Sequence, residues 1–139
     1  MKLRRRQHGI ALVEALIAVL ILGIGVIGML GMQVKAYSAL GDAGMRAEAT
    51  LAADRLAGLM ASDMANINAY ALTATGTPSA RLTPWLNETQ AAIPNANVTV
   101  ALTAPSTSNP AWQVDIAIAW KRKATDKTNT HKVTTYLST

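Results

Sequence analysis

Hydrophobic and polar positions change their pattern along the chain, and the first pattern is an apolar run. From Ala15 to Met32, 18 residues follow one another without a charge. As a helix this run is about 27 Å long, close to the roughly 30 Å of bilayer hydrocarbon. Basic residues precede the run and none directly follows it. Because positive charges favour the cytoplasmic side, the pattern predicts a membrane-spanning helix with its N-terminus in the cytoplasm and everything beyond about residue 33 in the periplasm.

A helical period of three to four residues continues beyond the apolar run. It predicts one long helix from Ile10 to about Ile67, amphipathic in its second half. The expected apolar stripe consists of Met45, Ala49, Ala52, Leu56, Leu59, Met60, Met64 and Ile67.

The C-terminal part has the alternation of strands. Five prolines between Thr73 and Pro110 indicate loops interrupted by short elements. Alternation at 97–103 and 112–120 predicts two strands, and residues 131–137 predict a third after a polar turn at 121–129. The second strand directs one face to the core: Trp112, Val114, Ile116, Ile118 and Trp120. We expect an α+β fold, with a three- or four-stranded antiparallel meander against the C-terminal half of the helix.

Charge and cysteine content narrow the possible functions. The chain has no cysteine, which excludes disulfides, thiolate metal sites and thiol nucleophiles. Its net charge is +5, but four of its 13 basic residues are Lys2, Arg4, Arg5 and Arg6. A chain cut after Gly9 would keep nine basic and eight acidic residues, or about +1. Overall charge is then no argument for nucleic-acid binding.

Two residues separate this N-terminus from an ordinary signal anchor. Gly9 stands at the boundary between the basic patch and the apolar run, where a peptidase at the cytoplasmic face could cut. Glu14 lies inside the apolar stretch, where a carboxylate is costly and rarely lacks a partner. The sequence RQHG at 6–9 followed by IALVE at 10–14 resembles the class III leader of type IV pilins.

That resemblance implies specific sites. A prepilin peptidase would cleave between Gly9 and Ile10 and methylate the new amine of Ile10, and Glu14 would direct assembly. The implied fold is the type IV pilin fold, a long N-terminal helix on a small antiparallel sheet. The implied segments are a leader at 1–9, a transmembrane and assembly helix at 10–32, and a periplasmic head at 33–139. This head would include the second helix half at 33–68 and the meander at about 97–138.

The glycine-rich stretch at 20–28 and the region from Trp85 to Val100 look most like PilV-type minor pilins. This resemblance implies a minor pilin in the assembly or initiation of a type IV pilus. Its partners would be the peptidase, other major and minor pilins and an inner-membrane assembly platform. The chain would be a single-pass inner-membrane protein before assembly and part of the pilus at the cell surface afterwards. A minor pseudopilin of type II secretion and a DNA-binding pilin for uptake remain as alternatives.

The sequence does not support a catalytic site or a cofactor-binding motif. The glycines at 23–28 satisfy GxGxxG formally, but a dinucleotide site needs a strand before and a helix after them. With His8 in the leader and His131 in a strand, we expect no metal site, cofactor or enzyme activity, and His131 is interpreted as a surface residue. A possible basic contact patch comprises Lys121, Arg122, Lys123, Lys127 and Lys132. A solvated hairpin turn is the favoured interpretation of this patch over nucleic-acid contact.

Overall fold

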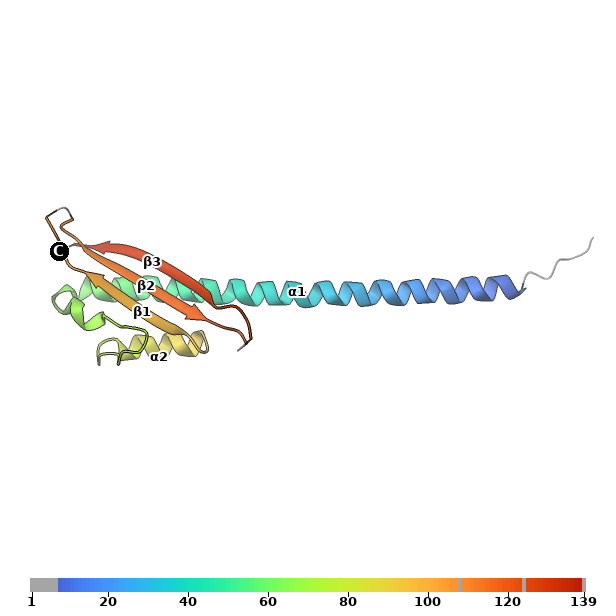
Figure 1. Cartoon of the computed structure of the whole chain (residues 1–139), viewed down its shortest axis with the longest axis horizontal. Coiled ribbons are helices and arrows are strands. Elements are labelled where there is room, and N and C mark those ends of the chain that lie inside the picture. Colours follow the sequence, from blue (N-terminus) through green and yellow to red (C-terminus); the bar gives the residue numbers. More distant parts are fainter. Residues whose placement is uncertain (1–7, 108, 124, 139) are drawn as a thin grey trace, which may run out of the picture. The chain divides into compact units, whose positions relative to one another are not determined.

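The structure is a computed structural model that describes residues 8–107, 109–123 and 125–138. Its elements are α1 (His8–Ser62), a 3₁₀ helix (Met64–Tyr70), α2 (Thr83–Ala92), β1 (Asn97–Thr103), β2 (Trp112–Trp120) and β3 (Asn129–Leu137). The three strands lie side by side next to the part of α1 that ends at Ser62 (Figure 1). The predicted α+β fold, a long N-terminal helix on a small antiparallel sheet, is confirmed.

The chain divides into two compact units, Met1–Asp42 and Ala43–Thr139. In the first unit α1 is exposed at every residue from Ile10 to Tyr37. By length and composition, Ile10–Ser62 can cross a membrane, and no residue of its most apolar window is buried. Among the described residues, a Cβ added at Gly23, Gly25, Gly28 or Gly31 would meet nothing within 4 Å, and α1 stays helical through these glycines.

In the second unit α1 buries a narrow stripe of Ala49, Ala53, Leu56 and Met60, each 0 % exposed. Their spacing of four, three and four residues keeps them on one helical face. The predicted stripe needs two corrections. Leu59 is 45 % exposed and does not belong to the core, while Ala53, which the sequence pattern passed over, does. Because the side chains of Ala49 and Ala53 are small, the elements that cover this face can approach the helix closely.

The sheet is an antiparallel meander in the order β1-β2-β3. β2 is central, and Ile116 pairs with Val100 on β1 and with Val133 on β3. The core face of β2 is confirmed at Val114, Ile116, Ile118 and Trp120, whereas Trp112 is half-buried at the strand end. β3 begins at Asn129, earlier than predicted, and an isolated bridge between Leu72 and Val100 extends the pairing on the β1 side. Alternation therefore located all three strands.

The helix α2 is a feature that the sequence analysis did not predict. Pro84 occupies its first turn, where a missing N–H costs nothing. Trp85, Leu86 and Thr89 are its buried residues. The Trp85 indole N–H donates to the carbonyl oxygen of Ala52 on α1 at 2.9 Å, which fixes α2 to α1.

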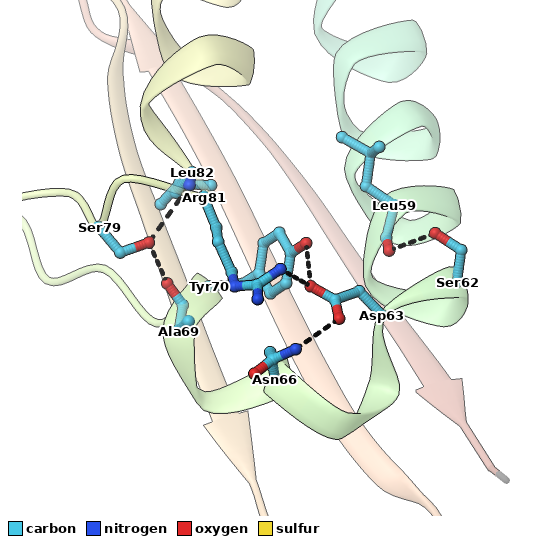
Figure 2. A network of polar contacts seen from close by, with 9 residues as sticks. All are labelled: Leu59, Ser62, Asp63, Asn66, Ala69, Tyr70, Ser79, Arg81 and Leu82. Atoms are coloured by element: carbon cyan, nitrogen blue, oxygen red, sulfur yellow. Dashed lines mark hydrogen bonds and ion pairs between the residues drawn. The ribbon is translucent and has the colours of Figure 1, made fainter.

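A polar cluster follows the last turn of α1, which ends at Ser62 rather than near Ile67. Asp63 is not helical in its backbone (φ −126°, ψ 42°). Its carboxylate accepts hydrogen bonds from Asn66 Nδ2 at 2.7 Å, the Tyr70 hydroxyl at 3.0 Å and Arg81 at 2.7 Å (Figure 2). One carboxylate thus joins the end of α1, the 3₁₀ helix and the segment that leads into α2.

Candidate functional site

The predicted processing and assembly residues lie in the first two turns of α1. Gly9 is in the helix, although no side chain is described before Ile10, and the rest of the leader, residues 1–7, lies outside the described residues. Ile10 is 75 % exposed, and Glu14 is also exposed. At one helical turn in from Ile10, Glu14 is presented to the surroundings of the helix, where a second helix could reach it.

The apolar side chains around Glu14 are left uncovered by the described residues. Leu12, Val13, Leu16 and Ile17 are each more than half exposed. An apolar surface of this length is not stable in water, and such surfaces mark contact with a membrane or with other proteins. The geometry therefore fits a helix that is covered by lipid or by neighbouring helices.

The five residues of the predicted basic patch are only partly brought together. Lys121, Arg122 and Lys123 line one hollow where β2 ends. Lys127 is exposed in the following turn. Lys132 is exposed on β3 opposite Ala117, on the sheet face away from Ile116 and the core. Three of the five cations thus line one hollow and the other two do not, and a contact of the patch with a partner stays a prediction.

Sequence reasoning missed the polar groups across from this cluster. Asn95, Asn97 and Thr128 line the same hollow. The register explains their approach, because Asn97 pairs with Ala119, which precedes Trp120 and the basic residues. The available sequence signal was weak, namely Asn95 in the loop after Pro94 and Asn97 at the start of the predicted strand.

Two buried nitrogen atoms lack partners in the described part of the chain, Trp120 Nε1 and His131 Nε2. His131 pairs with Ile118 and is half-buried, so its interpretation as a surface residue is wrong. It shares the core-facing side of the sheet because alternation places it with Val133. Within residues 8–107, 109–123 and 125–138 no group of three His, Cys, Asp or Glu could hold a metal ion.

Hydrogen bonds lower the pKa of two carboxyl groups in the second unit. The pKa of Asp63 lies below its ordinary value of 3.8, first because of the Asn66 amide and then because of Tyr70 and Arg81. The pKa of Asp115 is lowered first by the Thr134 hydroxyl and then by the Gln113 amide. Both carboxylates are satisfied by structural partners, an arrangement that holds the fold together and offers no general base.

Comparison with known families identifies a motif at the N-terminus. Residues 4–30 match the family described as the prokaryotic N-terminal methylation motif, a segment that contains Gly9, Ile10 and Glu14. No curated protein and no solved structure matches the chain. The motif and the exposed apolar helix support a type IV pilin-like or pseudopilin-like prepilin that is anchored in a membrane by its N-terminus.

Proposed function

We propose that this protein is a minor pilin of the PilV type that contributes to the assembly or initiation of a type IV pilus. A prepilin peptidase removes residues 1–9 and methylates Ile10. Before assembly the mature chain is anchored in the inner membrane with residues 33–139 in the periplasm. It then joins other pilins through an assembly platform. The observation that carries the proposal is the methylation motif at residues 4–30.

The role of Glu14 in this proposal follows from electrostatics. Cleavage after Gly9 creates a new amine at Ile10, which is carried into an apolar environment when the helices pack. A carboxylate one turn further along a neighbouring helix compensates this charge. Loss of one member of a buried ion pair strands the other at a cost of about 3–5 kcal/mol. Glu14 therefore acts between subunits, and its exposure in the single chain agrees with that role.

A minor pseudopilin of type II secretion shares the same leader, so the motif supports it equally. The two alternatives differ in where the fibre goes. A pilus subunit reaches the cell surface, whereas a pseudopilin stays in the periplasm. Recovery in sheared surface fibres separates them.

The test is fractionation of cells that make the peptidase, the other pilins and either wild-type chain or a variant. We expect wild type in sheared fibres, at the intact mass of a methylated chain that begins at Ile10. Glu14→Ala should reach the same mature mass, since the peptidase reads the leader, but should stay in the inner membrane. Gly9→Val should remain uncut.

The matched control is Glu48→Ala, which also removes one exposed acid from α1, in the part beyond the apolar run. It should enter the fibres as wild type does. Equal recovery of Glu14→Ala and wild type in fibres would remove the assembly role from Glu14. An unprocessed wild-type chain would overturn the prepilin assignment itself.

A further inference from the structure

A hollow of about 550 Å³ lies at the end of the sheet where β1 begins and β2 ends. Its size falls within the roughly 300–1,000 Å³ of small-molecule sites. The register pair Asn97 and Ala119 belongs to its lining, together with Trp120 at the last position of β2. The whole hollow belongs to the second unit, so its shape depends on the head alone.

The charge of the lining has one sign. Lys121, Arg122 and Lys123 contribute three cations, and no acidic residue is among the described residues that line the hollow. Arg122 also pairs with Asp126 at 3.6 Å. In the described part of the chain no hydrogen bond or ion pair engages the side chains of Lys121 and Lys123. The hollow is therefore complementary to an anion, and to one with more than a single charge.

The remaining lining supplies apolar surface and hydrogen-bonding groups. Ala119 and Trp120 contribute apolar atoms, and the side-chain amides of Asn95 and Asn97 can donate and accept. Asn95 has a φ of 61°, a left-handed conformation that asparagine adopts more readily than most residues. Turn geometry thus accounts for an asparagine at this position.

Trp120 adds an independent observation. The side chain is 1 % exposed, and its Nε1–H has no partner in the described part of the chain. Buried donors are normally satisfied by protein or by bound water. The indole therefore lies beneath the surface of the hollow, and it shapes the hollow without offering its N–H to a ligand there.

We propose that this hollow binds a phosphate-bearing organic anion about the size of a nucleotide. Phosphate oxygens match the basic side chains, since arginine and lysine are the usual phosphate binders in proteins. The organic part lies against Ala119 and the aliphatic stems of Lys121 and Lys123, with the asparagine amides on its polar edges. A long nucleic-acid strand is the less favoured source, because strands are held by stacking on exposed aromatic rings, and Trp120, the aromatic residue among the described residues of this lining, is buried.

The test uses the full chain in a neutral detergent, titrated with adenosine 5′-monophosphate by isothermal calorimetry. We expect saturable binding with a Kd below about 1 mM. In NMR spectra the indole signal of Trp120 should shift, while that of Trp85, bonded to the Ala52 carbonyl, should stay. Inorganic phosphate should bind more weakly, since it lacks the organic part.

Two double variants, each of which removes two positive charges, distinguish a specific binding site from general electrostatic attraction. Lys121→Gln with Lys123→Gln removes two cations that line the hollow, and should weaken binding about tenfold or more. Lys127→Gln with Lys132→Gln removes two exposed cations outside the lining, and should change the affinity less than about twofold.

Titration with a short single-stranded oligonucleotide shows whether the phosphate group that the hollow binds belongs to a free phosphate ester or to a nucleic-acid strand. If it displaces the mononucleotide and loses affinity in the first double variant alone, the hollow takes the phosphate groups of a strand. If it binds no more tightly than the mononucleotide, the ligand is a free phosphate ester. Absence of saturable binding, or equal losses in the two double variants, overturns the proposal.

Discussion

Leu56 and Leu59 offer a direct test of how the head is packed. Both are leucines of α1, three residues apart, and both belong to the apolar stripe expected from the sequence. The structure separates them, with Leu56 at 0 % and Leu59 at 45 % exposure. The same substitution to alanine should therefore have very different effects.

The expected losses follow from burial. Truncation of a fully buried leucine to alanine costs about 3–5 kcal/mol, since a cavity adds to the lost transfer energy. Leu59→Ala should cost less than about 1 kcal/mol, because half of the side chain already faces solvent and no closed cavity forms. For a unit of roughly 100 residues, 1 kcal/mol shifts Tm by about 4–8 °C. Leu56→Ala should thus lower Tm by at least about 12 °C, and Leu59→Ala by less than about 8 °C.

Tryptophan emission is a suitable assay, since Trp85, Trp112 and Trp120 all lie in the second unit and none in the first. The full chain in neutral detergent can be heated while emission is followed. Equal shifts for the two variants, or a larger shift for Leu59→Ala, would show that the assigned packing face of α1 is wrong.

Two further predictions concern the head and are measured by the same emission assay. Ile116→Asp should prevent folding, because an unpaired charge would replace a side chain that is 1 % exposed, whereas Asp115→Asn should cost less than about 1 kcal/mol on the partly exposed face; similar midpoints would refute the face assignment. The pKa of Asp63 is lower in the folded state, so its contribution to stability is complete above its ordinary value of 3.8 and is lost as the pH falls through the folded pKa. Asp63→Asn should therefore flatten the fall in Tm below about pH 4 and leave the slope between pH 5 and pH 7 unchanged, and an unchanged acid slope would contradict this assignment.

The strands were predictable because their alternation is strict and their core residues are large. Val114, Ile116 and Ile118 occupy one face, and that face is the buried one. The residues of the buried stripe on α1 were harder to predict, since spacings of three and four both fit a 3.6-residue period. The apolar stripe expected from the sequence includes Leu59 because its side chain is large, and it leaves out Ala53 because that side chain is small. Close packing between a helix and its cover favours the small residue at that position.

Two features depended on contacts that no local pattern encodes. The helix α2 is short, and the prolines around it predict a loop, although Pro84 stands where a helix tolerates it. The hollow near Trp120 joins the start of β1 to the end of β2, and only the register between the two strands brings Asn97 beside the basic residues. Sequence reasoning found the cations, but it could not find the groups that face them.

The division of the chain also determines how a failure of assembly can be interpreted. In the described part of the chain no residue before Met45 belongs to the core or packs against it. The large apolar side chains from Ile10 to Leu40 are exposed, so their burial has to come from lipid or from other helices. A change at Glu14 that keeps fibres from forming should leave the tryptophan melting curve as it is in wild type. Under that condition the loss of fibres reports on contacts between subunits, since misfolding of the head would move the curve.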